Sequence, residues 1–132
     1  MLTISKRLLN DIMDHSKTEY PNEACGILAG EDGEVRRVCR MSNSDRSSKT
    51  YMMDPSEQFR VFKELRRDKL ELSAIYHTHV ASEAYPSETD KKLAFYPEAA
   101  YVIVSLMDRE SPAVRAFRII DGNVEKEEIE VA

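Results

Sequence analysis

Two histidines separated by one residue stand near the start of the stretch YHTHVASEAYPSETD, residues 76–90. In a β-strand, residues i and i+2 point to the same face, so His77 and His79 would direct both imidazoles toward one point. Neutral imidazole is a good zinc ligand. Paired histidines also occur on ordinary half-exposed strands, so the pair alone leaves the question of a metal open.

Asp90 is the next candidate ligand, and it also has a purely structural interpretation. If Ser87 is a helix N-cap, Ser-x-x-Asp resembles a capping box, and an acid in the first turn suits the helix dipole. Only seven residues, 80–86, connect His79 to Ser87, so the first turn of this helix can return to the end of the histidine strand. Two histidines and one carboxylate would leave an open zinc position for water, as in catalytic sites.

A hydrolytic zinc site also needs a general base and a donor for the developing oxyanion. Glu23 precedes the apolar run ACGILAG and, considered alone, has the ordinary interpretation of a solvated turn residue. Cys25 raises the alternative of a thiol nucleophile, but nothing in the sequence supplies an orienting partner, so a buried free thiol is expected. The third histidine, His15, is expected to be a surface residue on the first helix.

Periodicity and turn signals predict the elements that must position these residues. Polar residues 42–49 form the longest expected loop. The predicted elements are, in chain order, a helix at 4–17 with Thr3 as N-cap, strands at 24–30 and 34–41 around a turn at 31–33, a short strand at 50–53, a helix at 55–69, a strand at 72–80, a helix at 87–96 ended by Pro97, a buried strand at 99–106, and a hairpin of 113–120 with 123–131.

The second helix has the clearest start signal. Asp54 is the expected N-cap, Pro55 suits the first helical position, and Glu57 is placed to complete a capping box. Its apolar stripe is expected to be Phe59, Phe62 and Leu65.

Composition and charge bound the class of protein. The 132 residues are 42% hydrophobic and 33% charged, which is typical of one globular domain, here 1–132. The order of the predicted elements indicates a mixed α/β (α+β) domain, with helices packed on a curved, largely antiparallel sheet. The formal net charge of −5 argues against a general nucleic-acid binder. No apolar run approaches the ~18 residues of a membrane helix, and the charged N-terminus does not resemble a signal peptide. We therefore expect a cytoplasmic protein.

Glu23, His77, His79, Ser87 and Asp90 together resemble the JAMM (MPN+) zinc metalloprotease motif, in its small prokaryotic form. NEACGILAG supplies the glutamate, and HTH is followed by seven residues, Ser87, two residues and Asp90. Val80 departs from the family, which often has proline there. The resemblance implies a JAMM/MPN-like fold with cytidine-deaminase-like layering. It further implies one zinc per chain held by His77, His79 and Asp90, with Glu23 as the proton carrier and Ser87 as an oxyanion donor.

The resemblance also implies a substrate class. Family members cut peptide or isopeptide bonds after the C-terminal Gly-Gly of ubiquitin-like proteins. Two classes compete: a sulfur-carrier protein trimmed after Gly-Gly, and a protein conjugate carrying a ubiquitin-like modifier. The short stretch 107–112 has no room for the long insertion of linkage-specific deubiquitinases, which favours the sulfur carrier.

Other classes of function remain as alternatives. One is a non-catalytic MPN scaffold domain, although such domains typically lack a ligand and all five signature positions are filled here. Another is a zinc nucleobase deaminase, which would need a PCxxC pair that the chain does not have. The oligomeric state stays open, a homodimer included.

Overall fold

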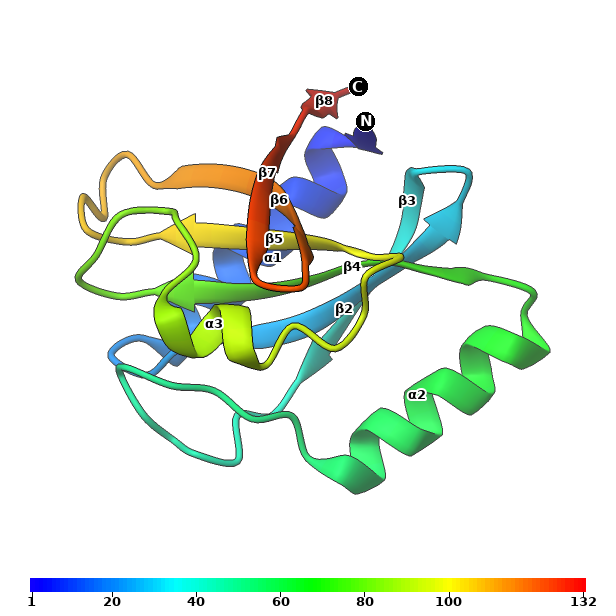
Figure 1. Cartoon of the computed structure of the whole chain (residues 1–132), viewed down its shortest axis with the longest axis horizontal. Helices are drawn as coiled ribbons and strands as arrows, with labels where there is room; N and C mark the ends of the chain where they lie inside the picture. The colour runs from blue at the N-terminus through cyan, green and yellow to red at the C-terminus, as the bar shows by residue number, and fades with distance from the viewer.

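The histidine strand lies in the middle of one eight-stranded sheet in the computed structural model, which describes residues 1–132 (Figure 1). The strand order is β7-β6-β5-β4-β2-β3-β1-β8. The β1–β3, β1–β8 and β4–β5 pairs are parallel and the other neighbours are antiparallel. The strands are β1 (Leu2–Ile4), β2 (Cys25–Glu31), β3 (Glu34–Met41), β4 (Glu71–His79), β5 (Ala100–Ser105), β6 (Ala113–Ile120), β7 (Asn123–Glu127) and β8 (Ile129–Val131).

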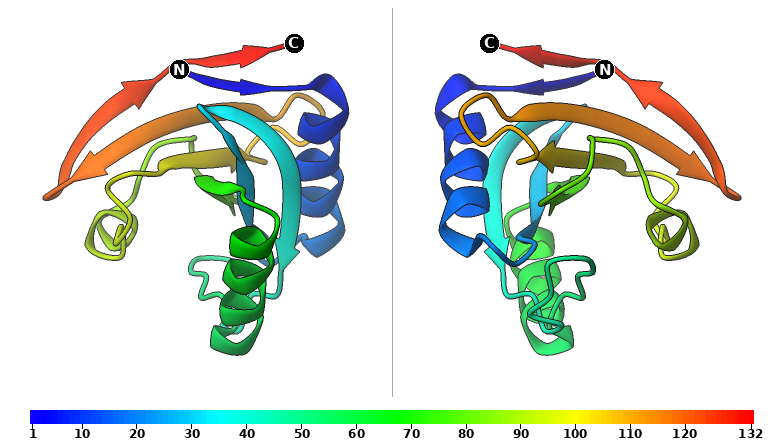
Figure 2. Two further views of the ribbon diagram at one scale, coloured as in Figure 1. Left: turned by 90° about the vertical axis from the view of Figure 1, so that its right-hand side faces the viewer. Right: turned by 90° about the vertical axis from the view of Figure 1, so that its left-hand side faces the viewer.

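Three helices complete the chain: α1 (Lys6–Glu19), α2 (Pro55–Arg67) and α3 (Glu88–Lys92). Figure 2 shows α1 and α2 on opposite sides of the curved sheet. Ile12 of α1 belongs to a core cluster with Tyr76, whereas Leu65 of α2 belongs to a second cluster with Ile75. Because Ile75 and Tyr76 are neighbours on β4, the two clusters occupy the two faces of the sheet. The predicted mixed α+β architecture is therefore confirmed.

The last two strands of the chain lie at the two opposite edges of the sheet and connect them. β7 and β8 are separated only by Glu128, yet they pair at opposite ends of the strand order. The N–H of Leu2 donates to the carbonyl of Glu128 at 2.8 Å, so β1 meets the chain where it crosses between edges. The sequence predicted one strand over 123–131, and the structure divides it between the two edges.

The first helix begins later than predicted. Thr3 lies in β1 and is not the N-cap. Ser5 caps α1 instead, and its Oγ accepts from the N–H of Leu8 at 3.2 Å. The apolar Ile4 fits the predicted helical stripe but is buried from a three-residue strand. So short a strand has too little periodicity to be distinguished from a helix start.

The start of α2 follows the prediction only in part. Oδ1 of Asp54 accepts from the N–H groups of Ser56 and Glu57 at 2.8 and 3.2 Å. The capping box is absent, because the Glu57 carboxylate accepts from the N–H and hydroxyl of Ser42 at 2.8 and 2.7 Å. Glu57 therefore ties α2 to the end of β3.

The predicted apolar stripe of α2 is correct for Leu65, which is buried, and for Phe62, which packs against the core, but wrong for Phe59. Val61 and Leu65 are its buried residues, whereas Phe59 is 67% exposed. Residues four apart share one helix face, so the contact face is set by Val61 with Leu65 and leaves Phe59 outside it. The predicted strand at 50–53 is reduced to one bridge between Met53 and Asn43.

His15 is a further correction, since it is buried and not at the surface. Its Nδ1 is 2.6 Å from the hydroxyl of Tyr76, a fully buried residue of β4. A Cβ added at Gly26 would overlap the Tyr76 ring, so glycine there makes room for the ring. The helix pattern alone could not reveal this partner, which comes from a strand 61 positions away.

Candidate metal centre and active site

The strand β4 directs His77 and His79 to the face of the sheet that α2 covers. Both side chains are buried, and they follow Ile75 at intervals of two residues. Thr78 points to the other face, where its Oγ accepts from the N–H of Ala24 at 2.7 Å. β4 pairs with β2 on one side and β5 on the other, which fixes the positions of the two histidines.

The side chain of Asp90 meets both histidines. Its Oδ2 lies 3.2 Å from Nε2 of His77 and 3.0 Å from Nε2 of His79, and the two Nε2 atoms are 3.2 Å apart. A tetrahedral zinc ion with bonds of about 2.0–2.1 Å separates its ligand atoms by about 3.3 Å. The three atoms thus form a triangle of the size that zinc requires, and this donor set fits a zinc site.

The two imidazoles are held in different ways. Nδ1 of His79 donates to the carbonyl of Glu83 at 2.9 Å, which directs Nε2 toward Asp90. His77 has no such partner, since its Nδ1 is buried without a hydrogen bond. The ring of Tyr51 instead stacks on His77, with centroids 4.4 Å apart. Packing therefore sets the orientation of His77, and a backbone hydrogen bond sets that of His79.

Ser87 and Asp90 form the predicted capping box, and this does not exclude Asp90 from the histidine cluster. Oγ of Ser87 accepts from the N–H of Asp90 at 3.0 Å, and Oδ2 of Asp90 accepts from the N–H of Ser87 at 2.9 Å. The same Oδ2 faces both histidines. The helix is shorter than predicted, ending at Lys92. Because Ser87 acts only as an acceptor in the cap, its hydroxyl proton is free for another partner.

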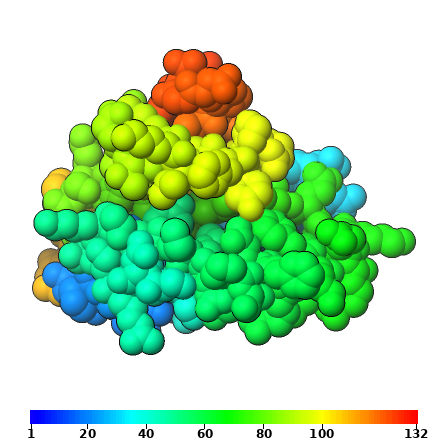
Figure 3. All heavy atoms as spheres, turned by 60° about the horizontal axis from the view of Figure 1, so that its bottom comes forward, coloured from blue at the N-terminus to red at the C-terminus, as the bar shows by residue number.

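Glu23 is buried, contrary to the solvated turn residue expected from its position alone. Its N–H donates to the carbonyl of Ser47 at 2.8 Å, and its carbonyl accepts from Nδ2 of Asn43 at 3.0 Å. Together with His79 and Ser87, it lines a cavity of about 250 Å³. Residues 42–54 (teal to green) and 80–96 (yellow-green) border this region at the surface (Figure 3).

The environment shifts the acid–base properties of this cluster. Burial raises the pKa of Glu23 to about 8, and the Asp90 carboxylate adds to the rise while His79 opposes it. Burial would also raise the pKa of Asp90, but hydrogen bonds with His77 and His79 outweigh it and hold that pKa far below its usual range. Burial lowers the pKa of His77. For His79, the Asp90 carboxylate and the Glu83 carbonyl outweigh the effect of burial and raise the pKa.

Cys25 is a buried free thiol, as expected. Burial is the main cause that raises its pKa to about 12. A thiol that stays protonated at neutral pH is a poor nucleophile, which disfavours the alternative of a cysteine hydrolase.

Tyr51, Asn43 and Glu83 support the site in ways that composition and spacing did not predict. Asn43 lies in the segment expected to be a loop, and Tyr51 lies in the segment expected to be a short strand. Glu83 contributes only its backbone carbonyl, a group common to every residue, so no sequence signal exists for it.

Comparison with known proteins identifies the family to which this chain belongs. A family model described as prokaryotic homologs of the JAB domain matches residues 5–120. The chain belongs to this family. Among curated members, the CysO-cysteine peptidase of Mycobacterium tuberculosis (strain H37Rv) is 41% identical over 133 residues, covering 99% of this chain and 91% of the relative. A probable TtuB-protein conjugate cleaving protease of Thermus thermophilus is 36% identical, covering 92% and 78%.

Solved structures share this fold. The protein DSY2949 of Desulfitobacterium hafniense has a TM-score of 0.90 at 35% identity, covering 100% of this chain and 93% of the other. The structure described as JAMM, a metalloprotease-like zinc site in the proteasome and signalosome, has a TM-score of 0.64 at 20% identity and supports the fold alone. None of the helices in this JAB domain has the length and apolar character needed to span a membrane.

Proposed function

We propose that this chain is a zinc-dependent peptidase that hydrolyses the bond after a C-terminal Gly-Gly of a ubiquitin-like or sulfur-carrier protein. One observation carries the proposal: the buried carboxyl group of Glu23 lines the same cavity as His79 and Ser87. A candidate ligand, a candidate base and a free hydroxyl thus share one small space. Membership of a family with named peptidases supports the same activity.

His77, His79 and Asp90 are the residues that would hold the zinc ion. Bound there, zinc would act as a Lewis acid toward the scissile carbonyl and would lower the pKa of water to about 7. This chemistry requires no side-chain nucleophile, in keeping with the buried Cys25.

Glu23 would carry the proton. Its carboxylate accepts a proton from the attacking water, whose oxygen bonds to the carbonyl carbon of the second glycine. The C–N bond then breaks, and Glu23 gives the proton to the departing amine. Its carboxyl group lines the same cavity as His79, a position from which one group can take the proton from the water and return it to the amine.

Ser87 would stabilise the oxyanion that forms during attack. Its Oγ accepts the N–H of Asp90 in the cap, which fixes the oxygen while leaving the hydroxyl proton available. A preorganised donor of this kind strengthens its bond as negative charge develops.

The names of the relatives support two related substrate classes. The CysO-cysteine peptidase covers nearly the whole of this chain and favours a carrier protein bearing a residue after Gly-Gly. The TtuB-protein conjugate cleaving protease favours removal of a modifier from a protein conjugate. A conjugate contains a target protein in addition to the modifier. The connection between β5 and β6 is short and leaves little surface to bind that target protein, so we favour the carrier.

The activity is tested with zinc-loaded protein and a ubiquitin-like carrier extended by one residue after Gly-Gly. We expect release of that residue by the wild type and none after chelation. The matched control is Glu88→Gln, because the Glu88 side chain is 84% exposed on α3. Cleavage by Glu23→Gln at the wild-type rate would contradict the mechanism.

A further inference from the structure

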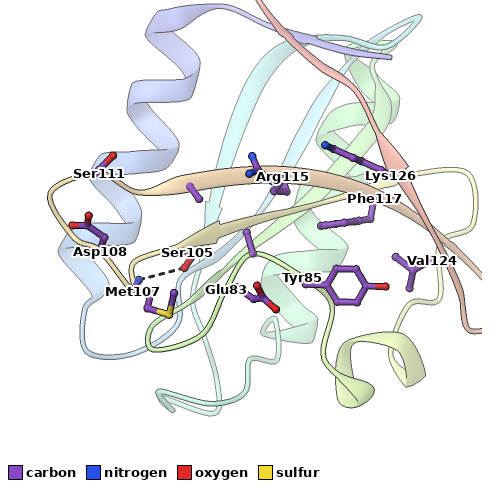
Figure 4. Close-up of a pocket in the computed structure, with 12 residues that line it drawn as sticks. Glu83, Tyr85, Ser105, Met107, Asp108, Ser111, Arg115, Phe117, Val124 and Lys126 are labelled. Atoms are coloured by element: carbon purple, nitrogen blue, oxygen red, sulfur yellow. Dashed lines mark hydrogen bonds between the residues drawn. The ribbon is translucent and has the colours of Figure 1, made fainter.

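A second, larger cavity lies next to the candidate active site but shares no lining residue with it. Its volume is about 440 Å³. Its floor is the face of β5, β6 and β7 on which Phe117 lies, and its walls are the loops at 83–85 and 107–111 (Figure 4). Tyr85 meets Phe117 edge to face, with ring centroids 5.4 Å apart. The floor is thus partly apolar and accessible from solvent.

The loop 80–86 separates this cavity from the candidate metal centre. Residues 80–82 line the small cavity that contains Glu23 and His79, whereas residues 83–85 line the large one. The carbonyl of Glu83 accepts from Nδ1 of His79. The two cavities therefore lie on either side of one short segment, which His79 holds in place through the carbonyl of Glu83.

Charges line the large cavity in two groups. Glu83 and Asp108 lie on the loops, whereas Arg115 and Lys126 lie on the strands (Figure 4). Lys126 pairs with Phe117 across β6 and β7, and Arg115 is two residues from Phe117, so the two cations share one face. None of these four side chains forms an ion pair within the protein.

We propose that this cavity binds the residue released after Gly-Gly, and that Arg115 and Lys126 recognise its free carboxylate. The inference rests on the proposed function. The amino end of that residue must face the metal centre, across the loop that carries Glu83, so its carboxylate points toward the strands. After cleavage, the new ammonium group lies on the side of Glu83 and Asp108.

Size and charge together define the substrate class. A cavity of this volume is in the range of about 300–1,000 Å³ that is usual for small ligands, whereas a folded partner would need an interface of about 800 Å². Two cations on the same floor repel each other, and an anion between them relieves that repulsion. The cavity therefore suits a single C-terminal amino acid with a small or apolar side chain, in preference to a lysine within a folded protein.

The decisive comparison uses two carriers that differ at one atom group. Each ends in Gly-Gly followed by alanine, as the free acid or as the carboxamide. We expect Arg115→Gln/Lys126→Gln to lower kcat/KM about tenfold for the acid, through KM, and to leave the carboxamide unchanged. Arg7→Gln is the matched control, because Arg7 is exposed on α1 without an ion pair. Equal losses on both carriers, or no loss on either, would overturn the assignment.

A second measurement does not depend on activity. Amide resonances of Ser105, Met107 and Phe117 are followed while L-alanine or L-alaninamide is added to the zinc-loaded protein. We expect saturable shifts with L-alanine that weaken with the amide and in the double variant. If the wild type cleaves neither carrier but these shifts appear, the proposed function fails and the cavity assignment stands. If it cleaves the carriers without such shifts or any acid preference, the cavity assignment fails alone.

Discussion

Ser87 and Asp90 bond to each other in both directions: Oγ of Ser87 accepts from the N–H of Asp90, and Oδ2 of Asp90 accepts from the N–H of Ser87. The same Oδ2 lies within 3.2 Å of Nε2 of both His77 and His79. Asp90 therefore takes part both in the N-terminal cap of α3 and in the candidate set of zinc ligands. The structural and the metal-binding interpretations of Asp90 are compatible.

Asp90→Ala should lose both roles. We expect zinc occupancy to fall from about one per chain toward zero, and the free energy of unfolding in a chelator to fall by about 1 kcal/mol through the lost cap. Metal analysis and urea denaturation measure the two effects. Full zinc occupancy in this variant would reduce Asp90 to a capping residue.

Ser87→Ala provides the matched comparison. It removes the cap acceptor and the free hydroxyl but none of the candidate ligands. We expect zinc to be retained, stability to fall by a similar amount, and kcat to fall about 100-fold through the lost oxyanion donor. A kcat near the wild-type value would exclude Ser87 from the reaction.

Glu23→Gln should keep zinc and abolish turnover. General acid–base catalysis contributes about 100- to 10,000-fold, and glutamine cannot carry the proton. Single-turnover assays of zinc-loaded protein measure this loss. A variant that loses zinc as well would assign Glu23 to the metal and not to proton transfer.

The same substitution should change the pH dependence of stability. The pKa of Glu23 rises from 4.5 to about 8 on folding, so the wild type loses stability as pH increases between these values. Chelator-treated Glu23→Gln lacks this loss. We expect it to be more stable than wild type by about 2 kcal/mol at pH 8, a gain that disappears at pH 4. A gain that does not depend on pH would contradict the shifted pKa.

Tyr76→Phe tests the buried contact between α1 and β4. It removes the hydroxyl that meets Nδ1 of His15 at 2.6 Å and leaves a buried polar atom unpaired, at a cost of about 1–3 kcal/mol. Tyr85→Phe is the control, because Tyr85 is 48% exposed. Chemical denaturation of the two variants should differ by at least 1 kcal/mol, and equal stabilities would show that the contact contributes nothing.

How far the sequence could predict the site depended on how local each relationship is. Strand alternation brings His77 and His79 to one face, and the capping pattern places Asp90 in a first helical turn; both are short-range rules. Glu23 differs, because its burial depends on Ser47 and Asn43 in a distant loop. Only family resemblance could join it to the cluster.

The errors in the fold have the same origin. His15 was wrongly expected at the surface because its partner, Tyr76, lies on a strand that helical periodicity cannot detect. Phe59 was wrongly expected in the core because apolar residues on both sides of α2 allow more than one stripe. The crossing of the last strands between sheet edges depends on closure of the whole sheet, which no local pattern encodes.

The short length of α3 affects how zinc would bind to and leave the site. The helix has five residues and buries none of them, whereas His77 and His79 belong to a strand paired on both sides. Local opening of so small a unit costs far less than unfolding of the sheet. Asp90 could thus swing away while both imidazoles stay in place, so zinc exchange would proceed through fraying of α3. Zinc bound to Asp90 would in turn stabilise α3 against local opening and slow hydrogen exchange at the amides of that one helix.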